Sequence, residues 1–198
     1  MNAGIPANGA PGAATRSPGR LQTIAILAVT AIVVGVGAIA FGGGGITTDP
    51  GITMGSTGTA PAVGGRLPDF TAQLPDGTKV SLASLAGKPL WLTFGASWCP
   101  DCRSEAPDVQ AVYQKYKDQG LQLVAIFEES GADITAYSGR AGLTFPILVD
   151  ENGVLRNAYR ALGLPTHYFV GADGVIREVR IGGIHPDEMD RAVLGILN

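Results

Sequence analysis

The chain has only two cysteines, Cys99 and Cys102, and they lie in "GASWCPDCRS", between an apolar run and a helical pattern. The run over residues 90–94 is too short for a helix and suits a buried central strand. The segment after the cysteines repeats apolar residues at three- and four-residue steps and ends at Gly120, which predicts a helix. A strand, a Cys-x-x-Cys pair and a helix therefore follow one another directly. The pair is a candidate structural disulfide, metal site or redox couple.

The patterns on either side of this junction indicate an α/β domain. A Pro75-Asp76-Gly77 turn joins two short extended runs, which predicts a hairpin with Phe70 facing inward. After the cysteine helix the sequence predicts a strand in "LQLVAIFEE", an inserted helix in "ADITAYSGRAG" capped by Asp133, and a strand in "FPILVD". A helix in "VLRNAYRAL", a hairpin around "GADG" and a last amphipathic helix complete it. This order predicts a mixed central sheet with helices on both faces.

The first 65 residues have a different composition from the rest, with Arg16, Arg20 and Asp49 as their only charged residues. Residues 21–41 are uncharged, and a helix of that length spans a bilayer core of about 30 Å. The two arginines before it predict that residues 1–20 are cytoplasmic and that the carboxyl domain lies outside the cytoplasmic membrane, anchored by a single pass. The alternative is secretion after signal cleavage near Ala40.

Two further segments follow from composition. Residues 42–65 are rich in glycine and threonine without hydrophobic periodicity, which predicts a flexible linker. Residues 66–198 have the composition of one folded domain. The formal net charge of −3 gives no basic surface for nucleic acid, so nucleic-acid binding is excluded as a function.

The position of the cysteines favours redox exchange. Cys99 lies at the predicted helix start, where free N–H groups and the helix dipole stabilise a thiolate and lower the thiol pKa below the ~8.5 of free cysteine. We expect an accessible Cys99 that attacks a disulfide and a more buried Cys102 that resolves the mixed disulfide.

Other uses of the pair are weaker but stay open. A disulfide closing so small a loop adds little stability, because its entropic effect grows with loop length. A zinc site needs four ligands and the chain has no second cysteine pair. A copper(I)-binding module could combine the two thiolates with His167 or His185. A peroxidase of the same fold is disfavoured, since no PxxxTxxC pattern precedes Cys99.

Together, "WCPDCRSEAP" and the later "LGLPTHYFVGADGVI" resemble the thioredoxin fold, and within it the membrane-anchored TlpA/ResA-like and DsbE-like thiol–disulfide oxidoreductases. The resemblance covers residues 64–198. It rests on the WCxxC box, on Pro107 five residues after the second cysteine, on the inserted helix and on the Pro165-Thr166 pair.

The resemblance implies roles for residues besides the cysteines. Pro165 would be a cis-proline facing the pair, with the backbones of Leu164 and Thr166 available to a substrate chain. Glu105 would exchange a proton with Cys102, although an acid in the first turns of a helix is also favoured structurally. Trp98 would shield the sulfurs and offer substrates a flat apolar surface, and the alternative is that it only caps the core. His167 departs from the small polar residue common in the family. It is either a structural residue of the sheet whose hydrogen bonds are satisfied, or a residue that modulates the chemistry of the two sulfurs.

The resemblance also implies an activity and its partners. The chain would reduce protein disulfides outside the cytoplasm without a cofactor, for example those of apocytochrome c before haem attachment. A membrane thiol reductase would supply the electrons, because the chain has no second cysteine pair to relay them. An oxidising folding enzyme with the same site is the alternative, because direction depends on the redox potential.

Overall fold

The computed structural model describes residues 51–55 and 60–198. The predicted cytoplasmic segment 1–20 and the predicted membrane helix 21–41 lie outside these residues. Within the part of the chain that is described, no helix is long and apolar enough to cross a membrane.

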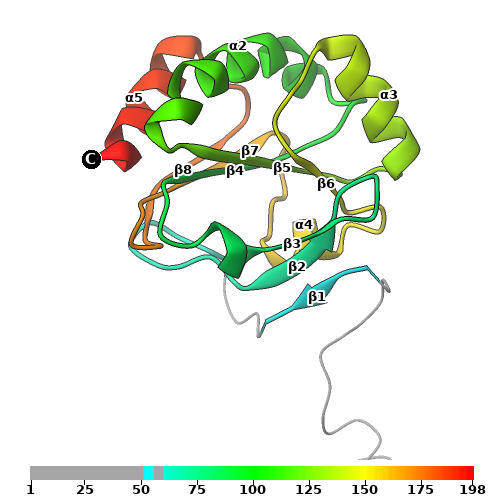
Figure 1. The fold of residues 1–198 in the computed structure, drawn as a ribbon, viewed down its shortest axis with the longest axis horizontal. Coiled ribbons are helices and arrows are strands. Elements are labelled where there is room, and N and C mark those ends of the chain that lie inside the picture. Colours follow the sequence, from blue (N-terminus) through cyan, green and yellow to red (C-terminus); the bar gives the residue numbers. More distant parts are fainter. Residues whose placement is uncertain (1–50, 56–59) are drawn as a thin grey trace, which may run out of the picture. The chain divides into compact units, whose positions relative to one another are not determined.

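A mixed eight-stranded sheet forms the centre of the fold (Figure 1). Its strand order is β1-β2-β6-β5-β4-β7-β8, and β3 pairs with β2 off this path. β4, β5 and β6 run parallel, while the remaining pairs are antiparallel. The strands are β1 Thr53–Met54, β2 Phe70–Gln73, β3 Lys79–Ser81, β4 Leu90–Gly95, β5 Gln122–Phe127, β6 Ile147–Val149, β7 Thr166–Val170 and β8 Ile176–Ile181.

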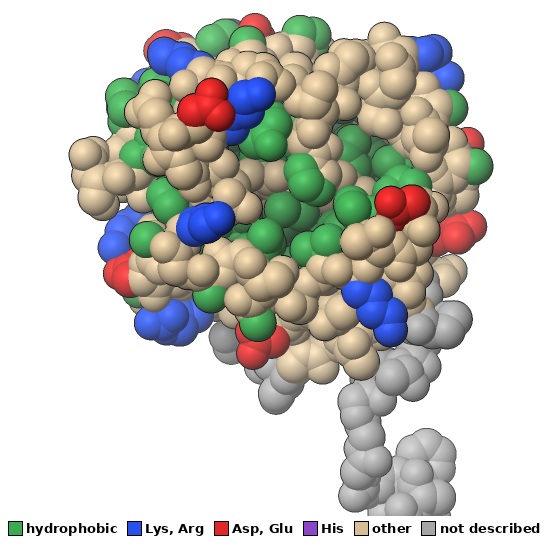
Figure 2. Space-filling model, in the orientation of Figure 1, with side chains coloured by type: hydrophobic (Ala, Val, Ile, Leu, Met, Phe, Trp, Pro, Cys, Tyr) green, Lys and Arg blue, Asp and Glu red, His purple; other side chains and the backbone are tan. Residues whose placement is uncertain are grey.

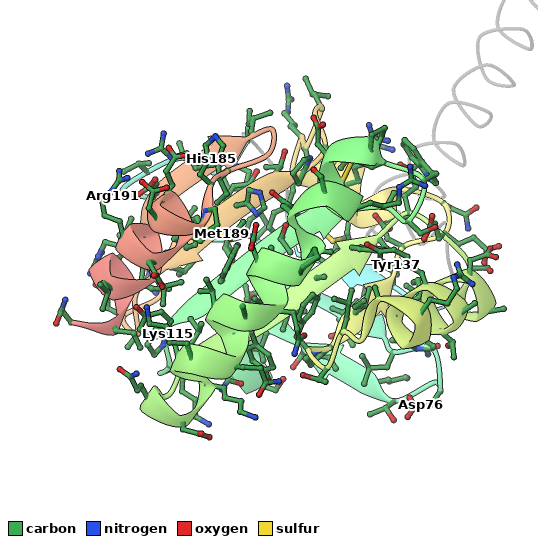
Figure 3. The ribbon with its side chains drawn as sticks, turned by 90° about the horizontal axis from the view of Figure 1, so that it is seen from above. Asp76, Lys115, Tyr137, His185, Met189 and Arg191 are labelled. Atoms are coloured by element: carbon green, nitrogen blue, oxygen red, sulfur yellow. A yellow bond between two sulfur atoms is a disulfide. The ribbon has the colours of Figure 1, made fainter. Side chains whose placement is uncertain are left out.

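α2, α3 and α5 cover one face of this sheet, and the short α4 lies on the other face, on the side toward which the edge with β1–β3 lies (Figure 1). Seen from above, α2 crosses the middle with α5 on one side and α3 on the other (Figure 3). The α-helices are α2 Pro100–Tyr116, α3 Gly131–Ala141, α4 Val154–Ala158 and α5 Pro186–Leu197, with short 3₁₀ helices η1 Leu82–Leu85 and η2 Lys117–Gln119.

Alternation along the strands divides the core into two layers. One face of β4, for example Trp91, packs with α2, α3 and α5. The other face, including Leu92 and Phe94, packs with α4 and β2. Successive strand residues point to opposite faces, so a strand buried on both sides reads as the continuous apolar run seen in the sequence.

The surface between these elements carries charges of both signs. In the view of Figure 2, hydrophobic side chains gather in a central hollow, with Lys, Arg, Asp and Glu scattered around it. This mixture agrees with the small net charge of the chain.

The thioredoxin-like α/β architecture, the 66–82 hairpin with a buried Phe70, and the inserted helix α3 are confirmed. The helix predicted from residue 154 ends earlier than expected, because Arg160 adopts a left-handed conformation (φ 51°) and turns the chain. The cap of α3 is also corrected. Its N-cap is Ser130, whose hydroxyl accepts the N–H of Asp133 at 3.2 Å.

The predicted linker over 42–65 needs a correction at its described residues. Thr53 and Met54 pair with β2, and the Ile52 side chain is buried in the core. Gly64 and Gly65 exchange backbone hydrogen bonds with Ile176 at 2.9 Å. The burial of one apolar side chain and the pairing with the open edge of β2 hold residues 51–55, and the backbone hydrogen bonds to Ile176 hold residues 64–65. Residues 51–55 and 60–65 therefore belong to the folded domain.

Candidate active site

The cysteine pair lies where β4 gives way to α2, as the sequence predicts. Cys99 is the N-cap of α2 and Pro100 is its first residue, a position that suits proline because the N–H there has no helical partner. The Cys99 Sγ accepts the backbone N–H of Cys102 at 3.2 Å. The two residues form a disulfide, with their Cα atoms 5.3 Å apart. The Cys99 sulfur thus lies at the positive end of a 17-residue helix, where negative charge is stabilised.

Burial of the sulfurs differs from expectation. Cys99 is 4% exposed and Cys102 is 6% exposed, so the prediction of an accessible Cys99 is wrong for this disulfide form. Both pack with Ala96 and with the half-buried Leu164. The adjacent Trp98 is instead 58% exposed, and it presents an apolar ring beside the pair.

The loop before β7 closes over the disulfide. The Leu164–Pro165 bond is cis, as predicted, and Pro165 is buried. The Pro165 carbonyl accepts the N–H of Gly182 at 2.8 Å, and the Thr166 hydroxyl donates to the Gly163 carbonyl at 2.6 Å. Thr166 lies between Phe94 of β4 and Ile181 of β8. The pairing of a substrate chain with Leu164 and Thr166 stays a prediction.

Glu105 is buried on the same face of α2 as Cys102, one turn further along. Its Oε2 accepts the N–H of Ile184 at 3.3 Å. Its Oε1 lies 3.4 Å from Nε2 of His167, a fully buried residue of β7. Sequence reasoning considered both residues but did not bring them together, because their contact depends on how α2 crosses the sheet.

The sequence patterns do not single out a second buried acid near the cysteines, Glu129. Its Oε1 accepts both the N–H of Ser97 at 2.9 Å and the Ser97 hydroxyl at 2.6 Å. It therefore holds the loop that leads into Trp98 and Cys99. The available signal was the pair of acids that follows β5, Glu128 and Glu129, because the ends of β4 and β5 meet at the same edge of a parallel sheet, where sites form.

The two acids also influence Tyr137 of α3. Burial raises the pKa of Tyr137, Glu129 and Glu105 add to that rise, and Arg103 opposes it. In Figure 3, Tyr137 and His185 lie on opposite sides of α2. The cysteine end of the domain is thus a small packed apolar cluster with the buried carboxyl groups of Glu105 and Glu129 near it.

Neither histidine is placed to complete a metal site with the cysteines. Nδ1 of His167 is occupied by Trp91 and Thr93, and His185 is the N-cap of α5. Among the described residues, no group of three His, Cys, Asp or Glu side chains could hold a metal ion.

Residues 63–179 match the AhpC/TSA family over more than half of the chain. The chain belongs to the AhpC/TSA family. It is similar to the thiol-disulfide oxidoreductase ResA of Oceanobacillus iheyensis, with 33% identity over 112 residues, 56% of this chain and 58% of the relative. The thioredoxin-like protein YneN of Bacillus subtilis is 34% identical over 119 residues, 58% of this chain and 69% of the relative.

A solved structure agrees with these relatives. The putative thiol:disulfide interchange protein DsbE from Chlorobium tepidum superimposes with a TM-score of 0.66 at 25% identity, over 70% of this chain and all of that one. The predicted resemblance to TlpA/ResA-like thiol–disulfide oxidoreductases is therefore confirmed, and the relatives' names support an oxidoreductase. The chain spans about 58% of the length of the ResA relative.

Proposed function

We propose that this AhpC/TSA-family chain is a thiol–disulfide oxidoreductase that acts on cysteines of other proteins. The observation that carries the proposal is the Cys99 sulfur at the N-cap of α2, bonded to Cys102 and packed against the cis Leu164–Pro165 loop. A thiolate at Cys99 would be stabilised by the helix end, and Cys102 is within bonding distance to resolve a mixed disulfide.

The reaction proceeds in two exchanges. The Cys99 thiolate attacks a substrate disulfide, a Cys99–substrate bond forms, and one substrate sulfur leaves as a thiolate. Cys102 then loses its proton, and its thiolate attacks the Cys99 Sγ. The Cys99–Cys102 bond forms and the second substrate sulfur leaves as a thiolate. The substrate gains two electrons, its two thiolates take up protons from water, and the chain ends in the disulfide form described here.

Three neighbours would assist this exchange. The exposed Trp98 would contact the substrate chain, and the backbones at Leu164 and Thr166 would align it beside Pro165. Glu105, buried one turn from Cys102, would take the Cys102 proton before resolution. Because Glu105 also lines a hollow of about 340 Å³ between α2 and the start of α5, the proton can pass on to water.

The proposal extends to direction and place. Reduction outside the cytoplasm, for example of apocytochrome c, is supported by the ResA-like and DsbE-like relatives and by the predicted anchor over residues 21–41. The membrane thiol reductase that would return electrons to Cys99–Cys102 is part of this proposal, because the chain itself has no further cysteines.

The reduction potential of the Cys99–Cys102 couple tests direction. A value near the ~−270 mV of thioredoxin supports the reductase, and one near ~−120 mV supports the oxidising folding enzyme. The same preparation is assayed for reduction of insulin disulfides. Loss of insulin reduction in Cys99→Ser is expected, and a wild-type chain that binds copper(I) tightly but reduces nothing would overturn the enzyme in favour of the metal module.

A trapping experiment tests the order of attack. In Cys102→Ser the mixed disulfide on Cys99 cannot be resolved, so a reduced chain mixed with a disulfide-bonded protein should retain that protein covalently until dithiothreitol is added. Cys99→Ser is the matched control and should retain nothing. Trapping in Cys99→Ser instead would reverse the assigned roles.

A further inference from the structure

His167 is a buried polar residue at this site that the exchange described above does not use. It lies on β7 opposite Thr93 of β4, and it is fully buried. Its ring faces α2, the same side of the sheet as Trp91 and Phe169. A polar ring at this depth needs partners for both nitrogens.

The partners of Nδ1 fix which nitrogen carries the proton. The indole Nε1–H of Trp91 lies 3.3 Å from Nδ1, and the Thr93 hydroxyl lies 3.0 Å from it. An indole N–H can only donate, so Nδ1 accepts. The neutral ring therefore carries its proton on Nε2.

The Glu105 carboxyl group lies beside that Nε2. The Glu105 Oε1 lies 3.4 Å from Nε2, longer than a full hydrogen bond, and no other described group accepts from Nε2. A buried donor without an acceptor is costly, so this N–H favours a carboxyl oxygen held beside it. The other Glu105 oxygen is held by the N–H of Ile184. The carboxyl group thus lies between the His167 ring of β7 and the segment before α5.

We propose that His167 is a positioning residue that holds the Glu105 carboxyl group beside Cys102, through its Nε2–H. This inference rests on the proposed function, in which Glu105 takes the Cys102 proton. Other titratable groups around Glu105 are Asp101 and Asp108 of α2 and His185, which line the same hollow, and Tyr137 of α3. Within the described residues no hydrogen bond joins Glu105 to any of these four side chains, whereas the buried His167 ring lies 3.4 Å from its Oε1.

The test measures the coupling between Glu105 and the Cys102 thiol directly. In a Cys99→Ser background Cys102 is the only thiol of the 198-residue chain, so its alkylation by iodoacetamide can be followed against pH. Glu105→Gln removes a negative charge near the thiol and should lower the midpoint of the profile. The midpoint difference between Glu and Gln at position 105 is the coupling.

Two substitutions at position 167 distinguish the role of Nδ1, which accepts from Trp91, from that of Nε2, which faces Glu105. His167→Asn keeps an acceptor near Trp91 and Thr93 but is too short to donate to Glu105, so the coupling should fall at least about two-fold. His167→Gln extends a donor amide toward Glu105 and should restore part of it. His185→Asn is the matched control, since it changes the chain's other histidine, which lines the same hollow, and should leave the coupling unchanged.

An unchanged coupling in His167→Asn would overturn the inference. This is the result in which His167→Asn shifts the alkylation midpoint by the same amount whether residue 105 is Glu or Gln. Should His167→Asn fail to fold, the ¹⁵N signals of the two histidines still decide. The signal of His167 Nε2 should be that of a protonated nitrogen and should move in Glu105→Gln, and a proton on Nδ1 would overturn the assignment. None of these measurements uses a substrate, so absence of insulin reduction by the wild-type chain would remove the proposed function and leave the positioning of Glu105 by His167 separately decided.

Discussion

At the scale of single residues, buried carboxyl groups are the unusual feature of this domain. Asp150 follows β6 and is fully buried, and it accepts the N–H groups of Leu155 at 2.9 Å and Arg156 at 2.8 Å. It thereby supports the start of α4. Burial raises the pKa of Asp150 from 3.8 to about 6, against the lowering effect of these backbone N–H groups. A group that holds a helix end is therefore also a source of pH dependence.

The pH dependence follows from that shift. Because the folded-state pKa lies above the unfolded value, the folded protein binds the proton more tightly, and this stabilisation is complete below pH 3.8 and lost as the pH rises through about 6. The free energy of unfolding should fall by up to about 3 kcal/mol over this window relative to Asp150→Asn. Urea unfolding of both chains at several pH values between 3.5 and 7 measures the difference. Parallel stability curves would contradict it.

A second residue-scale prediction concerns Trp98. Its ring is mostly exposed, so Trp98→Ala should change the free energy of unfolding by less than about 1 kcal/mol. Its position beside Cys99 should nevertheless make the substitution slow insulin reduction several-fold. Leu194→Ala is the matched control, because Leu194 is also exposed but lies on α5. Equal rates for the two variants would show that Trp98 does not contact the substrate.

At the scale of elements, the sequence predicted most helices and strands but not their ends. The spacing of apolar residues indicates which face of an element is buried. It predicted β4, α2 and α5 because their apolar patterns are long or continuous. Ends depend on single backbone contacts. Asp133 looked like the cap of α3, whereas Ser130 caps it and Asp133 accepts the Ser130 hydroxyl at 2.6 Å. Both residue types favour caps, so the sequence alone could not choose between them.

The cap gives a prediction of its own. Ser130→Ala removes the acceptor for the Asp133 N–H at the start of α3, and it should lower the free energy of unfolding by about 1 kcal/mol. Ser138→Ala, within the same helix, should be close to neutral, because alanine is the stronger helix former there. Chemical denaturation of the two variants compares them. A loss at Ser138 as large as that at Ser130 would argue against the cap.

At the scale of the whole molecule, the site depends on contacts that no local pattern reveals. The Cys-x-x-Cys pair and Glu105 lie within one helix and could be found by spacing. His167 reaches Glu105 only because β7 pairs with β4 in the register that sets Thr93 opposite His167. Glu129 reaches Ser97 because β4 and β5 end at the same edge of the sheet. The burial of Cys99 likewise follows from Leu164, which arrives from the loop before β7.

The last prediction concerns the place of the whole chain. Residues 21–41 are uncharged and follow two arginines, so the chain should be found intact in the membrane fraction with its cysteines outside. In intact cells treated with a reductant, a membrane-impermeant maleimide should then label Cys99→Ser and Cys102→Ser chains, which have one thiol each. Replacing two residues of the 21–41 segment with lysine is the control and should release the chain from the membrane, because a charge within the bilayer costs several kcal/mol. Recovery of a soluble product that lacks residues 1–40 would instead establish cleavage near Ala40, and an intact chain whose thiols stay unlabelled would place the domain in the cytoplasm. Both of these results are compatible with redox chemistry at Cys99 and Cys102. Reduction of proteins outside the cytoplasm is compatible with cleavage near Ala40 but not with a cytoplasmic domain.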